Sequence, residues 1–149
     1  KRLLKLFNDE KKLGLDNFKK IKKFEKNCIE SKNKLNKKIK KLSVTHEIYG
    51  YGATSKSTTI LNFCRIGKKE IKGIFDTSYT KIGKVTPLTH IPILNYKKSF
   101  NKIKPKVCIL FAWNHAVEIC NKEVINLKNG MKFISHIDKK FIKPKKFFL

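Results

Sequence analysis

A glycine turn followed by hydroxyl side chains and a lysine is the segment of this sequence best suited to bind a ligand. It comes directly after one predicted strand and opens a predicted helix. Glycines allow a backbone to approach a ligand closely, and a helix N-terminus offers free N–H groups and partial positive charge. We therefore predict that this run binds a phosphate or diphosphate group. The run consists of Gly50, Tyr51, Gly52, Ala53, Thr54, Ser55, Lys56, Ser57 and Thr58.

Two known phosphate-binding patterns nearly match this turn. Ser55 stands where a P-loop has its second glycine, and the apolar segment at 107–113 ends without the aspartate that organises magnesium. These departures argue against an active nucleoside triphosphatase. Ser55 also takes the place of the third glycine in the dinucleotide-binding pattern. Asp76 nevertheless ends the second predicted strand, where a ribose-binding acid is expected, so it joins the candidate site residues.

Three residues outside the turn are further candidates for ligand contact. His90 lies in a long loop predicted over 77–95, where its imidazole either faces a ligand or only hydrogen-bonds the loop. Asn114 follows an apolar strand at the edge where open α/β sheets bind ligands, and it also suits a helix cap. Lys81 comes soon after Asp76 and can lie over the glycine turn. Nothing arranges Ser, His and Asp as a nucleophilic triad, so we assign no catalytic residue.

The periodicity of apolar residues predicts the elements that position these candidates. A stripe at three- and four-residue spacing predicts a long lysine-rich helix ending near residue 42, with a shorter helix before it and a break near Gly14. Strands and helices then alternate: strands at 46–52, 71–76, 107–113 and 131–137, and helices at 55–66 and 115–127. This alternation predicts an α/β domain with a mainly parallel sheet flanked by helices, preceded by the long N-terminal helix.

The charge of the chain comes almost entirely from lysine. Lys and Arg total 36 against 11 Asp and Glu, a net charge of +25, yet only Arg2 and Arg65 are arginines. A basic chain suggests nucleic acid as a partner, but arginine is the side chain best suited to bidentate phosphate contacts. We therefore interpret most of the lysine as the background of an AT-rich genome and expect no nucleic-acid partner. Apolar runs shorter than the roughly 18–20 residues of a membrane span also predict no membrane.

The four cysteines indicate neither a metal site nor a disulfide framework. They show no CxxC or CxxH spacing and stand in apolar contexts, as buried side chains do: Cys28, Cys64, Cys108 and Cys120. We expect free thiols in a reducing cytoplasm and no bound metal. The chain begins at Lys1 inside a helical pattern, so we also expect it to be part of a longer protein.

Three separated segments resemble one known family. They are GYGATSKSTTILNFC at 50–64, FDTSYTKIGKVTPLTHIPI at 75–93 and AWNHAVEICNKE at 112–123. In this order they look like the C-terminal domain of S-adenosylmethionine-dependent C-methyltransferases, which act on nucleotide-linked deoxysugars. The resemblance covers essentially the whole chain, with the leading helices matching the connector before the glycine turn.

This resemblance implies a Rossmann-like domain that closes over an active site and helps to hold a nucleotide-diphosphate sugar. It divides the chain into a helical connector at 1–43 and the Rossmann-like domain at 44–149. Family members carry a zinc-binding lobe and a methyl-donor-binding domain ahead of these parts, and this sequence holds neither. We therefore expect S-adenosylmethionine to bind the complete enzyme and not this chain, and the isolated chain to be inactive.

Two other functions remain open on the sequence. One is a free-standing nucleotide-binding module of Rossmann type, in which Asp76 binds a ribose. The other is a basic nucleic-acid-binding protein, which the scarcity of arginine disfavours. By the family analogy, the glycine turn faces either the nucleotide sugar or the missing methyltransferase domain.

Overall fold

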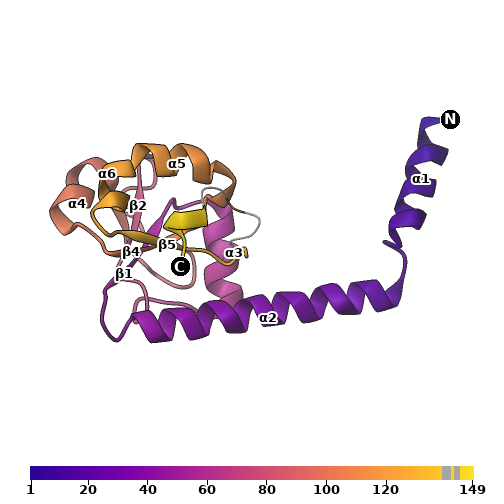
Figure 1. Ribbon diagram of the computed structural model, residues 1–149, viewed down its shortest axis with the longest axis horizontal. Coiled ribbons are helices and arrows are strands. Elements are labelled where there is room, and N and C mark those ends of the chain that lie inside the picture. The colour runs from indigo at the N-terminus through magenta and orange to yellow at the C-terminus, as the bar shows by residue number, and fades with distance from the viewer. Residues whose placement is uncertain (139–141, 143–144) are drawn as a thin grey trace.

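Five parallel strands form the sheet of the described chain. The computed structural model describes residues 1–138, 142 and 145–149; residues 139–141 and 143–144, within the second expected domain, lie outside it. The strands are β1 (Ile48–Tyr51), β2 (Ile74–Asp76), β3 (Ile93–Asn95), β4 (Val107–Leu110) and β5 (Lys132–Ile134), in the spatial order β3-β2-β1-β4-β5. All neighbouring pairs are parallel. The predicted α/β fold with a parallel sheet is confirmed (Figure 1).

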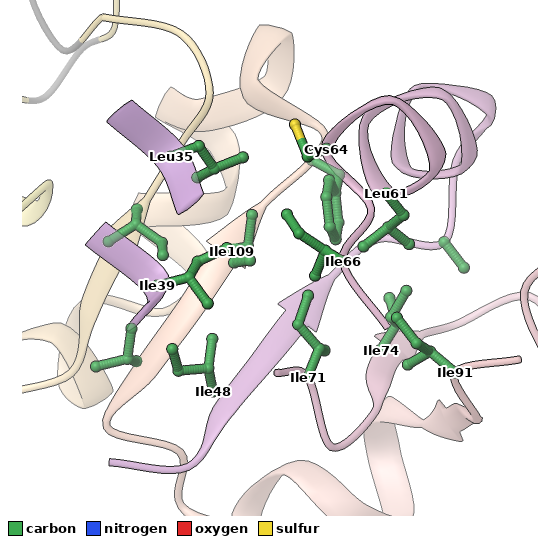
Figure 2. Packing of buried hydrophobic residues seen from close by; sticks show 14 of the residues in the cluster. Leu35, Ile39, Ile48, Leu61, Cys64, Ile66, Ile71, Ile74, Ile91 and Ile109 are labelled. Carbon is green, nitrogen blue, oxygen red and sulfur yellow. The ribbon is translucent and has the colours of Figure 1, made fainter. Parts of the chain in front are cut away.

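One face of the sheet is covered by α2 (Phe18–Leu42) and α3 (Ser55–Cys64). Side chains alternate between the faces along each strand, so Ile48, Ile74 and Ile109 all point to this side. They pack against Ile39 of α2 and Leu61 of α3, as Figure 2 shows. Burying each such side chain contributes about 1.5–3 kcal/mol, so this layer holds the end of α2 firmly on the domain.

The opposite face is covered by α4 (Tyr96–Ile103), α5 (Ala116–Lys122) and α6 (Val124–Lys128). Its core is rich in aromatic rings. Phe75 meets Phe100 edge to face at 5.0 Å between ring centroids, and Tyr51 meets Phe133 in the same way at 5.7 Å. Such pairs add about 0.5–1.5 kcal/mol beyond the area that they bury. A short 3-10 helix, η3 (Lys145–Phe147), precedes the buried Phe148 on this side.

The prediction of a loop over 77–95 is wrong at its end. Residues 93–95 form β3, and α4 follows at once, with the Asn95 side chain accepting a hydrogen bond from the Lys98 N–H at 3.1 Å. A strand of three residues is too short to show alternation in the sequence. Pro87 and Pro92 precede this strand, and prolines between periodic segments are typical of loops.

The helix predicted over 115–127 is interrupted. A 3-10 helix, η1 (Trp113–His115), comes first, and Glu123 separates α5 from α6 with φ −96° and ψ 16°. Asn114 lies inside η1, and α5 begins without a side-chain cap, so the expected capping role of Asn114 is wrong. Gly130 ends this helical region as predicted, in the left-handed conformation with φ +95°.

The N-terminal helices extend away from the sheet. The helix α1 (Arg2–Leu13) ends at Gly14, which adopts φ +64°, so the predicted break is confirmed. Figure 1 shows α1 and the first half of α2 projecting from the body of the domain. No residue of α1 is buried, and in α2 burial is confined to Leu35 and Ile39. The apolar stripe of α2 therefore faces the core at one end and solvent at the other.

Candidate functional site

The strand order creates a crevice at the carboxyl edge of the sheet. The central strand β1 pairs with β2 on one side and β4 on the other, and the helices that follow β1 and β4 cover opposite faces. Open α/β sheets bind ligands at such a point. A pocket of about 370 Å³ lies there. It is lined by the ends of these strands and by α4, η1 and α5: Tyr51, Gly52, Phe75, Asp76, Thr77, Tyr96, Ala112, His115, Glu118, Ile119 and Lys122.

The two glycines of the turn have different structural roles. Gly50 is buried inside β1, where a Cβ atom would come within 2.8 Å of both Ile74 and Phe111. It lets the strand pack closely and does not line the pocket. Gly52 has φ +87°, which side chains disfavour, and it faces Ala112 across the crevice. The small residues Gly52 and Ala112 leave room for a ligand between β1 and β4.

Asp76 braces the turn against the loop after β2. One of its carboxylate oxygens accepts a hydrogen bond from the Ala53 N–H at 2.7 Å, and the other accepts one from the Ser78 N–H at 2.7 Å. Lys81 donates to the Ala53 carbonyl at 2.8 Å, so the prediction that Lys81 lies over the turn is confirmed. Both backbone groups of Ala53 are thus held by side chains, one from the end of β2 and one from the loop that follows it, and this holds the crevice wall in shape.

The N-terminus of α3 keeps two backbone donors available. The Thr54 hydroxyl accepts a hydrogen bond from the Ser57 N–H at 3.3 Å, and the buried Ser57 hydroxyl donates to the Thr54 carbonyl at 2.6 Å. The N–H groups of Ser55 and Lys56 have no acceptor among the described residues. The side chain of Lys56 is exposed beside them and is not part of the pocket lining.

A buried glutamate organises the far wall of the pocket. Glu123 is only 1% exposed, and its carboxylate accepts hydrogen bonds from the Tyr51 hydroxyl at 2.7 Å, from the Tyr96 hydroxyl and from the Asn126 amide at 2.8 Å. These contacts tie β1, α4 and the α5–α6 junction together. Glu123 is also the residue that separates α5 from α6.

A lysine is held over the pocket by this cluster. The Lys122 ammonium lies 3.7 Å from the centroid of the Tyr96 ring and 6.0 Å from that of Tyr51. A cation over an aromatic face is attracted by about 0.5–1 kcal/mol at an exposed site. At the rim, His115 lies 3.6 Å from Glu118, an exposed pair that contributes little to stability.

The tyrosine hydroxyls of this face resist ionisation. Burial, followed by the hydrogen bond to Glu123, raises the pKa of Tyr51 and the pKa of Tyr96. Burial, followed by the hydrogen bond to Glu47, raises the pKa of Tyr49 to about 12. The neutral phenols therefore belong to the folded state, and charging any of them opposes folding.

Alkaline pH is expected to destabilise the protein through these tyrosines. A tyrosine in an unfolded chain titrates near pH 10, so above about that pH the folded state binds more protons and loses stability as the pH rises. Thermal unfolding followed from about pH 9 to 12 should show a falling Tm, with a smaller fall in Tyr49→Phe. Tyr79→Phe is the control, because that ring is 87% exposed. Equal falls in all three proteins would contradict the assignment.

The structure brings some of the predicted site residues together and separates others. Tyr51, Gly52 and Asp76 line the pocket. His90 comes three residues before β3, toward the amino edge of the sheet, and it does not line this pocket. Asn114 is exposed next to His115 and is also outside the lining. The ligand contacts proposed for all of these residues remain predictions.

A larger hollow of about 770 Å³ lies elsewhere, between α2 and the residues after β5. It is lined by α2 side chains such as Phe24 and Leu35 together with Ser135, His136 and Phe148. None of its lining residues comes from β1, β2 or β4, the strands that meet at the crevice. We therefore place the candidate site in the smaller pocket.

The cysteines and the helices carry no sign of further sites in the part of the chain that the structure describes. Cys64, Cys108 and Cys120 are buried free thiols, as expected, and burial raises the pKa of each. Cys28 is half-buried. Among the described residues there is no cluster of potential metal ligands. A search of the same residues found no helix that combines the length and the apolar character needed to cross a membrane.

A parallel sheet flanked by helices, with a glycine turn after its central strand, defines a Rossmann-like domain. Comparison with known families identifies it further. Residues 1–137 match the model of the C-methyltransferase C-terminal domain, and the chain belongs to that family. The resemblance seen in the sequence is thereby confirmed, and the match includes α1 and α2.

One curated relative supports this assignment. The chain is 38% identical over 87 residues to the C-methyltransferase NovU of Streptomyces niveus. The matched region is 58% of this chain and 20% of the length of that protein. The chain thus spans about a fifth of this relative.

Proposed function

We propose that this chain is the substrate-binding C-terminal part of an S-adenosylmethionine-dependent C-methyltransferase that acts on nucleotide-linked deoxysugars. The observation that carries the proposal is the pocket at the carboxyl edge, between the glycine turn and α5, in a domain of this family. Its volume of about 370 Å³ is within the usual range for sites that bind small molecules. The aromatic and charged lining suits a ligand with both a ring and a diphosphate.

The glycine turn forms one wall of this proposed site. Gly52 opens the crevice, and the braced Ala53 keeps the turn from moving when a ligand arrives. The free N–H groups of Ser55 and Lys56 at the start of α3 are available to an anionic group near the mouth of the crevice. We assign the remaining turn residues, Thr54, Ser57 and Thr58, to holding this helix end in place.

The chemistry would take place on a domain that this chain does not contain. In the complete enzyme, a base on that domain would remove a proton beside a keto group of the sugar, and S-adenosylmethionine would supply the methyl group. The residues here fit S-adenosylmethionine poorly. Asp76 is the acid placed to bind the ribose of the donor, but it already accepts two backbone hydrogen bonds. The ammonium of Lys122 faces the same pocket and would repel the positive charge of the methyl donor. We therefore propose that the chain itself binds no methyl donor and supplies no catalytic group.

The projecting helices are the proposed link to that missing domain. Large apolar side chains on them are exposed, among them Phe7, Phe18, Ile21 and Phe24. Exposed apolar surface of this extent marks an interaction site. We propose that residues 1–43 form the connector and that these side chains contact the methyltransferase domain, upstream or on another chain. We also propose that the complete enzyme works in the reducing cytoplasm, which suits the free cysteines.

The alternative is a free-standing nucleotide-binding module of Rossmann type. It requires Asp76 to bind a ribose, and the geometry favours a bracing role because each carboxylate oxygen already holds one backbone N–H. A nucleic-acid-binding role is weaker still, because the chain has only two arginines, the side chain best suited to phosphate contacts.

Calorimetry with the 149-residue chain separates these functions. The proposal predicts binding of a deoxysugar linked to a nucleoside diphosphate, no binding of NAD and no methyl transfer to a keto-sugar nucleotide. Tight binding of NAD together with indifference to nucleotide sugars would establish the alternative. Methyl transfer by the isolated chain would overturn the assignment of chemistry to a missing domain.

A further inference from the structure

We propose that Lys122 is the residue that binds the diphosphate of the ligand, in place of the lysine in the glycine turn. The inference rests on the proposed function, because it assigns a charge to the same pocket. Lys122 and His115 are the basic residues of the lining, whereas Lys56 lies outside it. The ammonium of Lys81 is occupied by the Ala53 carbonyl.

The Lys122 ammonium lies over an aromatic ring that is itself held in place. It lies 3.7 Å from the centroid of the Tyr96 ring, and that ring is held by its hydroxyl's hydrogen bond to Glu123 and by packing against Phe100 at 4.9 Å between centroids. A lysine on a mobile stem loses side-chain entropy when it binds a ligand, and part of that cost is removed when the protein already holds it. Lys122 is thus prepared for an anion in a way that a free surface lysine is not.

The charge of Lys122 is also uncompensated. No carboxylate lies within 4.0 Å of its ammonium among the residues that the structure describes. The residue that follows Lys122 in the sequence, Glu123, is turned inward to two tyrosines and an amide. An anion that enters the pocket therefore meets a cation that has no carboxylate partner among the described residues.

The other charges of the pocket orient the ligand. Asp76 lies at the end of β2, and its negative charge repels a diphosphate from that side of the crevice. Glu118 is at the rim and is paired with His115. The diphosphate consequently lies toward α5, on the side of the crevice away from Asp76.

Two matched variants test this assignment. Lys122→Gln and Lys56→Gln each remove one lysine from the full chain, so the background charge falls equally. Calorimetry with thymidine diphosphate and uridine diphosphate should show affinity reduced about tenfold or more by Lys122→Gln, as expected for the loss of a charged hydrogen bond. Lys56→Gln should change affinity less than about twofold, because the Lys56 side chain lies outside the pocket lining and the change keeps the backbone N–H. Lys122→Arg should recover part of the loss.

The salt dependence supplies a second readout. The affinity of the natural chain should fall as salt is added, and this fall should be shallower in Lys122→Gln than in Lys56→Gln. If the chain binds a nucleoside diphosphate but both variants lose affinity equally, or only Lys56→Gln does, the assignment to Lys122 is wrong. If the natural chain binds no nucleoside diphosphate at all, the proposed function itself fails.

Discussion

Replacing Glu123 with alanine is expected to cost about 3–5 kcal/mol of folding stability, because it leaves buried polar groups without an acceptor. The hydroxyls of Tyr51 and Tyr96 and the amide of Asn126 all donate to this carboxylate. Tyr51 is 7% exposed, so water cannot readily replace the lost partner. Chemical denaturation of Glu123→Ala beside the natural chain measures the loss.

Glu118→Ala is the matched control for this prediction. Glu118 lies on α5, which ends one residue before Glu123. Its side chain is 83% exposed and paired with His115, so its removal should change stability by less than about 0.5 kcal/mol. Glu123→Ala should also weaken nucleotide binding, because the Tyr96 ring that supports Lys122 loses its hydrogen bond. A loss of stability no larger than that of the control would show that the cluster does not hold the two tyrosines together.

Ile39→Ala is expected to cost about 2–4 kcal/mol, whereas Ile21→Ala should cost less than about 0.5 kcal/mol. The two isoleucines lie on α2 about five turns apart and so on nearly the same side of the helix. Ile39 is 1% exposed in the core, and Ile21 is 51% exposed on the projecting half. The pair shares one chemistry and one helix, so the difference isolates the effect of burial.

Equilibrium chemical denaturation of both variants measures the two losses of stability. The expected result means that α2 is part of the domain at its end and a free surface at its beginning. Equal losses at the two positions would mean that the projecting half of α2 is also packed in solution, against α1 or a second copy. The molecular mass in solution would then distinguish packing against α1, in a monomer, from packing against a second copy, in a dimer.

The sequence predicts most of the sheet because buried parallel strands and glycine turns leave strong local signals. The segments around Ile48, Ile74 and Val107 are apolar and bounded by turns, and each forms a strand near the expected place. The glycine turn is likewise found at the end of β1, where the strand order opens the crevice. Local pattern was sufficient for these features.

Other features depend on contacts between segments that are distant in the chain. Lys122 is one lysine among many in the sequence, and only the ring of Tyr96, on another helix, distinguishes it. Glu123 looks like an ordinary surface charge. Its spacing did carry a signal, since it shares the inward phase of Ala116, Cys120 and Leu127, at intervals of three and four residues. A charged residue in that phase needs buried partners, which here are tyrosines.

The hydrogen bonds of Asp76 also depend on contacts that the sequence does not reveal. Its place at the end of β2 fits the ribose-binding pattern, and sequence alone gives no way to see that the turn itself occupies the carboxylate. The distinction depends on the position of the Ala53 N–H and on the loop that carries Ser78. The dinucleotide-binding pattern therefore predicts that Asp76 lies at the carboxyl edge of the sheet, but it does not predict which group its carboxylate binds.

The most direct test of the proposed function is to map a bound nucleotide sugar on the isotope-labelled chain by nuclear magnetic resonance. Titration with a deoxysugar linked to thymidine diphosphate should shift the backbone amide signals of Gly52, Thr77 and Lys122, which surround the crevice. Shifts that are absent, or confined to the hollow between α2 and Ser135, would contradict the placement of the substrate at the carboxyl edge of the sheet.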